Sequence, residues 1–134
     1  MIVVDASVLI GHFEPADSHH AEATALLKAH LTDTFASSVV TLAEVYVGAS
    51  RAGQADRFDR LLAQLAIRSL ELPADAAQRL GELRAMTGLK LPDCCVLYTA
   101  IRHNATIATF DDTLAARAND IGVNVAAAAG CARP

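Results

Sequence analysis

The sequence has few of the residues that mark secreted or membrane proteins. Its 134 residues include no tryptophan, 4% aromatic residues and 3 cysteines. An odd cysteine count, with Cys94 next to Cys95 and no C-x-x-C pair, argues against a disulfide framework or a zinc site. No apolar run approaches the roughly 20 residues of a membrane span, and the N-terminus lacks the basic region of a signal peptide. We therefore expect a cytoplasmic protein with no membrane partner.

Positive charge is also scarce. The chain carries 11 Lys and Arg against 15 Asp and Glu, a formal net charge of −4, and its lysines are Lys28 and Lys90. A protein that coats nucleic acid nonspecifically normally has a basic surface, which this composition excludes. Any polyanionic partner must be held by local arginines or by a metal ion.

What the sequence does contain is an alternation of strand-like and helix-like segments. The apolar periodicity predicts strands at 2–4, 35–39, 67–72, 106–108 and 122–125. It predicts helices at 6–13, at 16–31, from a cap at Thr41, from Gly53, at 74–87, and from the Leu91-Pro92-Asp93 segment. This order is typical of the α/β class. We expect one domain over residues 1–134, a three-layer α/β/α fold with a mostly parallel central sheet.

Four acids stand out by their position in this alternation. Asp5 directly follows the first strand, Glu44 lies in the first turn of the helix after the second, Asp93 begins a late helix, and Asp111 follows a later strand. Ligands of open parallel sheets bind at the carboxyl ends of the strands, so one pocket could collect all four side chains. Taken alone, each acid is explained about equally well as a site residue and as an ordinary helix cap or first-turn acid.

Together the four acids indicate a metal site. Carboxylates packed close together raise one another's pKa and destabilise the fold unless a cation neutralises them. Mg²⁺, or alternatively Mn²⁺, prefers such oxygen ligands. We expect Asp5 and Asp93 to be direct ligands, while Glu44 and Asp111 bind a second ion or orient water molecules.

Histidine and cysteine chemistry has weaker support. The histidines follow no catalytic-triad order or H-x-x-x-H spacing, and we expect them to be mostly solvated helix residues: His12, His19, His20, His30 and His103. Cys94 follows Asp93 among apolar neighbours with no basic group close in sequence, which predicts an inert, buried thiol.

The ordered set of acidic motifs resembles a known family. The motifs are Asp5-Ala6-Ser7 after the first strand, Thr41-Leu42-Ala43-Glu44, Leu91-Pro92-Asp93, and Thr109-Phe110-Asp111. In order and spacing they look like the four acidic signatures of PIN-domain ribonucleases. They are most similar to the toxin half of prokaryotic VapBC toxin–antitoxin pairs.

This resemblance implies a function and a set of site residues. It implies a metal-dependent endoribonuclease that acts on RNA, usually as a homodimer, and that a cognate antitoxin holds inactive. Carried over by position, the catalytic and metal-binding quartet is Asp5, Glu44, Asp93 and Asp111. The hydroxyls of Ser7 and Thr109 would support it. Asp112 is an extra acid beside the motif, which could share or replace the role of Asp111.

Two other classes of function fit parts of the pattern. A receiver-like phosphoacceptor domain has a similar length and acids around Mg²⁺, but it needs a late lysine, and no lysine follows Lys90. A non-catalytic PIN binding module would keep the fold without turnover. The intact acids at all four positions favour the enzyme, and a metal-dependent activity assay separates these two.

Overall fold

A computed structural model describes residues 1–126 as helices packed on a small parallel sheet. The strands are β1 (Ile2–Val4), β2 (Phe35–Ser38), β3 (Arg68–Leu70) and β4 (Thr106–Ala108). The helices are α1 (Ala6–Phe13), α2 (His20–Ala29), α3 (Val39–Arg51), α4 (Ala55–Gln64), α5 (Ala76–Thr87), α6 (Leu91–Arg102) and α7 (Asp112–Asp120).

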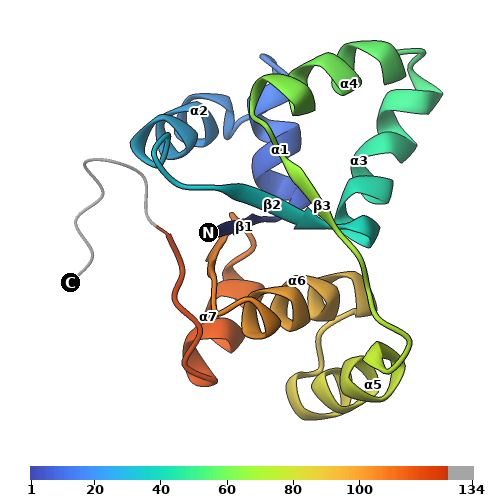
Figure 1. The fold of residues 1–134 in the computed structure, drawn as a ribbon. Helices are drawn as coiled ribbons and strands as arrows, with labels where there is room; N and C mark the ends of the chain where they lie inside the picture. The colour runs from blue at the N-terminus through green and yellow to red at the C-terminus, as the bar shows by residue number, and fades with distance from the viewer. Residues whose placement is uncertain (127–134) are drawn as a thin grey trace.

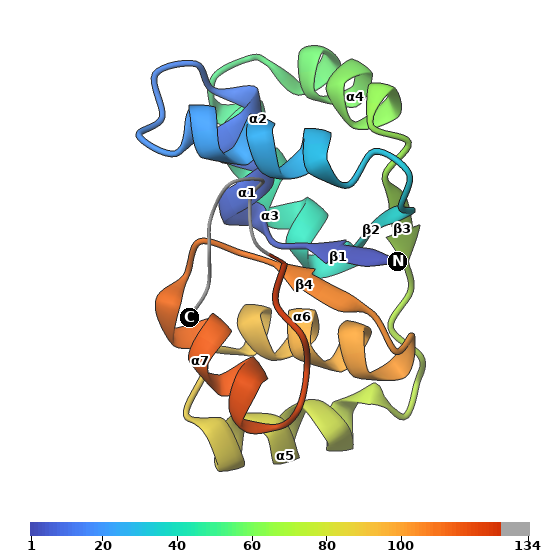
Figure 2. The ribbon, with the colours of Figure 1, turned by 90° about the vertical axis from the view of Figure 1, so that its left-hand side faces the viewer.

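The sheet is sandwiched between two helical layers (Figure 1). Its strand order is β3-β2-β1-β4, and each neighbouring pair is parallel. Helices α1 to α4 lie on one side of the sheet and α5 to α7 on the other, with α6 against the sheet and α5 packed on α6 (Figure 2). This confirms the predicted three-layer α/β/α fold with its parallel sheet.

Strand β1 is buried on both faces, which explains its continuous apolar sequence. Ile2 and Val4 belong to the core under α1 to α4, whereas Val3 belongs to the core on the side of α5 to α7.

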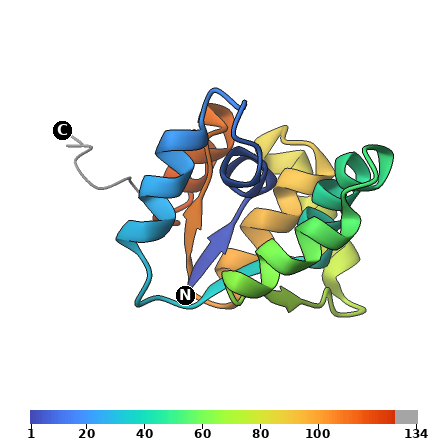
Figure 3. The ribbon, with the colours of Figure 1, turned by 90° about the horizontal axis from the view of Figure 1, so that it is seen from above.

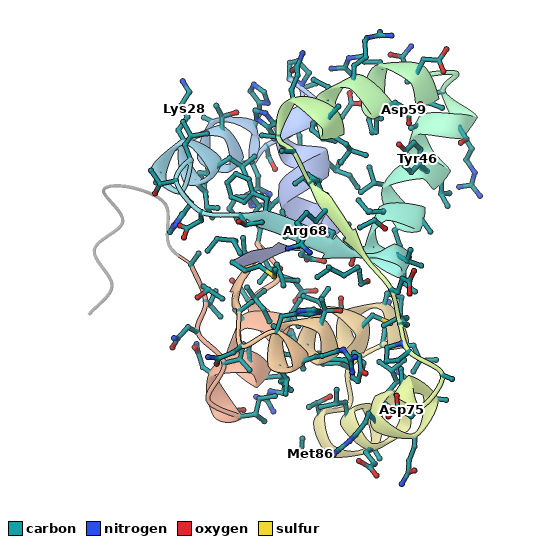
Figure 4. The ribbon with its side chains drawn as sticks, viewed as in Figure 1. Lys28, Tyr46, Asp59, Arg68, Asp75 and Met86 are labelled. Atoms are coloured by element: carbon teal, nitrogen blue, oxygen red, sulfur yellow. The ribbon has the colours of Figure 1, made fainter. Side chains whose placement is uncertain are left out.

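Seen from above, α1 lies between α2 and α3 (Figure 3). Helices α3 and α4 are joined by a hydrogen bond from the Tyr46 hydroxyl to the Asp59 carboxylate (Figure 4). This contact raises the pKa of Tyr46 to about 12.

Several predicted boundaries are wrong because side chains form turns and caps. Helix α2 begins at His20 rather than at residue 16, because Asp17 forms a turn before it. The Asp17 Oδ1 accepts from the backbone N–H of His19, and its carbonyl accepts from the backbone N–H of His20. Leu31, the last residue predicted for this helix, lies beyond its end and is 68% exposed. Helix α4 begins at Ala55, because Gly53 lies in a left-handed turn with φ +67°.

The start of α3 also differs from the prediction. Its cap is Ser38, whose Oγ accepts a hydrogen bond from the backbone N–H of Thr41 at 3.1 Å. Thr41 therefore lies inside the helix. Glu44 consequently lies beyond the first turn, which contains no acid. The cap comes three residues early because β2 runs directly into the helix.

The predicted strand over residues 122–125 is wrong in extent. Within the described residues it forms one parallel bridge, between Val125 and Ile107, and is not a full strand. Among residues 1–126, no helix has the length and apolar character needed to cross a membrane.

Candidate active site at the carboxyl end of the sheet

Asp5 lies at the centre of the carboxyl edge of the sheet. The registers that pair Val4 with Ala108 carry β1 and β4 to the same edge, so that Asp5 and Thr109 emerge side by side. The backbone N–H of Asp5 donates to the Ala108 carbonyl at 2.9 Å and extends the ladder by one bond. The Asp5 residue as a whole is 6% exposed.

The Asp5 carboxylate does not cap the helix that follows it. Asp5 occupies the N-cap position of α1, but its side chain makes no capping hydrogen bond. Instead, Oδ2 accepts hydrogen bonds from the Ser7 hydroxyl at 3.0 Å and the Thr109 hydroxyl at 2.7 Å. The backbone of Asp5 therefore occupies the N-cap position of α1, while its side chain belongs to the hydrogen-bond network at the edge of the sheet.

Ser7 and Thr109 extend this polar network to the β4–α7 connection. The Ser7 Oγ accepts from the backbone N–H of Phe110 at 3.1 Å, and the Thr109 Oγ1 accepts from the backbone N–H of Asp111 at 3.0 Å. The two hydroxyl oxygens are 3.5 Å apart. Since a buried polar group is costly unless it is hydrogen-bonded, this network fixes the Asp5 carboxylate relative to the loop that carries Asp111.

Glu44 reaches the same region from α3. Although the residue as a whole is exposed, loss of water around its carboxyl raises its pKa, and repulsion from Asp5 and Asp93 raises it further. A raised pKa with these causes means that the carboxylates are close enough to repel.

Asp93 approaches from the first turn of α6, where Pro92 occupies one of the first two helical positions. Burial raises the pKa of Asp93, and the charges of Asp5 and Asp111 raise it further, while Lys90 lowers it. Lys90 is therefore the nearby cation that sequence patterns do not single out. Its only signal is its place three residues before Asp93.

Asp111 does two things at the start of α7. Its Oδ1 caps the helix by accepting from the backbone N–H of Leu114 at 3.0 Å, and its charge raises the pKa of Asp93. Asp112, the first residue of α7, is exposed and is not among the charges that raise the pKa of Asp93. The electrostatic coupling thus involves Asp111 and not its neighbour.

The chemistry of this set fits a hard divalent cation. Within residues 1–126 none of the four acids forms an ion pair, and the one cation that lowers the pKa of Asp93 is Lys90. The repulsion among the acids is therefore only partly offset. In the same residues no three Asp, Glu, His or Cys side chains converge closely enough to bind one ion as they stand. Mg²⁺ suits such an open arrangement, because it keeps several water ligands and commonly takes only one or two carboxylates.

The histidines and cysteines are not among the groups that shift the pKa values of Glu44 and Asp93. The prediction that the histidines are mostly solvated is wrong for four of the five. His19 and His30 are half-buried, and so are His12 and His20, which lie between α1 and α2. The Nδ1 atoms of His12 and His20 lie 2.9 Å from the Thr24 hydroxyl oxygen and from the Gly11 carbonyl oxygen, respectively. Burial raises the pKa of the Cys94 thiol, in agreement with an inert cysteine.

The sequence and the fold can now be compared with known proteins. The family model of the PIN domain matches residues 2–120 of the chain. The search of curated proteins found no match to this chain.

Solved structures resemble the fold over most of its length. A chain of a toxin–antitoxin complex from Klebsiella pneumoniae is 31% identical, with a TM-score of 0.74 over 87% of this chain and 91% of that one. VapC20 from Mycobacterium tuberculosis, a toxin that cleaves the sarcin–ricin loop, is 18% identical, with a TM-score of 0.74 over 87% and 94%. A chain of VapBC2 from Rickettsia felis, bound to a promoter DNA fragment, is 20% identical, with a TM-score of 0.70 over 93% and 96%.

Proposed function

The chain belongs to the PIN-domain family, and from this membership we propose that it is a metal-dependent endoribonuclease, the toxin of a type II toxin–antitoxin pair. The observation that carries the proposal is the buried Asp5 carboxylate. It is bound by two hydroxyls on one oxygen and repelled by carboxylates from two other helices. The receiver-like phosphoacceptor is excluded, because the chain belongs to the PIN-domain family.

Asp5 and Asp93 are the proposed direct ligands of Mg²⁺ or Mn²⁺. Glu44 and Asp111 complete the set on its outer side, where they bind a second ion or orient water. When bound, the divalent ion lowers the pKa of a water molecule and stabilises the charge that develops on the phosphate. A single ion would be bound by Asp5 and Asp93, and a second ion would be bound by Glu44 and Asp111.

The protein's own groups hold and orient the parts of this reaction. Ser7 and Thr109 donate to Oδ2 of Asp5, and within residues 1–126 no hydrogen bond reaches its Oδ1, which is therefore available to a ligand. In the metal-free site burial and mutual repulsion raise the pKa values of Glu44 and Asp93, and a bound cation would oppose both shifts by neutralising the repelling charges. Lys90, whose charge lowers the pKa of Asp93, is a basic side chain that could act on a phosphate at this site.

The proposed partners are an RNA substrate, a cognate antitoxin and a second copy of the chain. The antitoxin is proposed because the 31%-identical structure is a toxin–antitoxin complex. The homodimer is supported by large apolar side chains left exposed on α3 and α6: Val39, Val47, Leu91 and Ile101. Closed two-fold dimers are the commonest oligomer, and light scattering should give twice the monomer mass. The cytoplasm, where RNA is available, is the proposed location.

The experiment is RNA cleavage by the purified protein. We expect cleavage with Mg²⁺ or Mn²⁺, no cleavage with EDTA, and no cleavage by the D5N variant. The matched control is D75N, because Asp75 is also an N-cap aspartate without a capping hydrogen bond but lies on α5, on the other side of the sheet from α3 (Figure 4). Undiminished cleavage in EDTA would overturn the metal mechanism. RNA binding without cleavage under any metal would favour a non-catalytic PIN module.

A further inference from the structure

His19 and Phe110 form an aromatic stack beside the acids. Their ring centroids are 4.6 Å apart and their planes are 9° from parallel, although the residues are 91 positions apart in the sequence. Phe110 packs its ring against the core under α1 to α4. The His19 side chain is 45% exposed, so part of the His19 layer of the stack is open to solvent.

The stack is attached to the acidic cluster through the backbone. Phe110 lies between Thr109, which donates to Asp5, and Asp111. Its backbone N–H donates to the Ser7 Oγ, which itself donates to Asp5 at 3.0 Å. The stack therefore keeps a fixed position relative to the Asp5 carboxylate.

Local structure also holds His19 in place. The backbone N–H of His19 donates to Asp17 Oδ1 at 2.8 Å, and its carbonyl accepts from the backbone N–H of Ala23 at 2.8 Å. A Cβ at Gly11 would lie 3.5 Å from the Cβ of His19 and 3.3 Å from that of Ala23, so glycine permits this close approach. The His19 ring itself makes only one polar contact in the described residues, at 3.9 Å to Asp17.

We propose that the exposed face of His19 is the platform on which one base of a single-stranded RNA substrate stacks, next to the phosphate that is cleaved. Single-stranded RNA is commonly recognised by bases stacked on aromatic side chains, including histidine. The platform rests on the proposed ribonuclease function and deepens it, since it assigns a substrate-binding residue.

The charge of the protein makes such a platform useful. With a net charge of −4 and acids at the site, the chain has little electrostatic attraction for a polyanion. Stacking supplies affinity that does not depend on positive charge, and it tolerates any base because every base has a flat face. RNA binding should therefore depend less steeply on salt than it does for a basic RNA-binding protein.

The test measures binding of a short single-stranded RNA that carries 2-aminopurine, whose fluorescence is quenched when the base stacks. The D5N background prevents cleavage while RNA affinity is measured. H19A should weaken binding about tenfold and remove the quenching, the range typical of losing one stacked base. H19F should retain both. H103A is the matched control, because His103 is an exposed histidine at the end of α6.

Each outcome decides the proposal. Unchanged affinity and quenching in H19A would overturn it, as would an equal loss in H19F, which keeps a flat ring without the imidazole nitrogens. A thermal melt of H19A shows whether this variant stays folded. H19F keeps the packing on Phe110 and so serves as the folded reference. With Asp5 intact, H19A should raise KM about tenfold and leave kcat nearly unchanged. Absence of any RNA cleavage by the wild-type protein would instead reject the ribonuclease function, and the binding assay would still decide the platform.

Discussion

Helices α1 and α7 both begin with an aspartate at the N-cap, yet the two carboxylates do different things. Asp111 turns toward its helix and accepts from the Leu114 N–H. Asp5 turns away from its helix and accepts from the hydroxyls of Ser7 and Thr109. Asp5 is buried, whereas Asp111 is exposed.

This difference separates a carboxylate that stabilises the fold from one that is free for chemistry. A capping aspartate contributes about 1 kcal/mol to helix stability. Asp5 makes no capping bond, and its burial near other acids costs stability. The structure thus keeps at Asp5 a charge that the helix does not need. Cavity size does not reveal this: the hollows of about 520, 330 and 230 Å³ contain none of the four acids.

The largest expected effect is that of D5N on activity. Removing the charge should lower the cleavage rate by more than the roughly 10- to 100-fold that changes in supporting residues cause. The melting temperature should not fall, because the side chain does not cap α1. The comparison breaks if D5N unfolds the protein while D75N does not.

The hydroxyl pair should give the next effect. T109V removes the 2.7 Å donor to Asp5 and the acceptor for the Asp111 N–H, and we expect about a 10- to 100-fold loss of cleavage. T109S keeps the hydroxyl and should retain most of the activity. Equal losses in both variants would mean that the methyl group, and not the hydroxyl, is what the site requires.

Asp111 sharpens the comparison through stability. D111A should lower the free energy of unfolding by about 1 kcal/mol, measured by urea denaturation. D111N should retain most of that stability, because asparagine is also a good N-cap, but it should lose activity with the charge. A D111A variant as stable as the wild type would show that this cap contributes nothing to the fold.

The smallest expected effect is on the pH dependence of the metal-free protein. The pKa values of Glu44 and Asp93 are raised in the folded state, so their ionisation opposes folding. This penalty is full above the folded pKa values and is relieved as pH falls through them toward the ordinary values near 4. The melting temperature in EDTA should therefore gain a contribution on going from pH 7 to pH 5, and this contribution should shrink in D93N. An identical pH dependence in D93N would contradict the raised pKa of Asp93, whose causes are burial first and then repulsion from Asp5 and Asp111.

Much of the fold could be predicted because its signals are local. The apolar run Ile2–Val4 predicts a buried strand, and the apolar periodicity predicts a helix that ends at residue 87. Both are confirmed. The start of α3 was mispredicted because Ser38 and Thr41 are both good caps, and only the path of β2 decides between them. The last strand was overestimated because one bridge to Ile107 looks the same in sequence as a full ladder.

The site is less predictable than the fold, because its contacts join distant residues. The order of the acids along the chain predicts that they gather at one edge of the sheet. The bond from Thr109 to Asp5 spans 104 positions, and the stack of His19 on Phe110 also depends on the packing of separate elements. No local pattern reveals that one aspartate caps its helix and another does not.

Binding of Mn²⁺, followed by electron paramagnetic resonance, tests the central claim most directly. We predict that the wild-type protein binds Mn²⁺, that D5N loses most of this binding, and that D75N keeps it. Mg²⁺ should compete for the same site. If D5N binds Mn²⁺ as well as the wild type does, the carboxylate at the end of β1 is not a metal ligand and this account of the site is wrong.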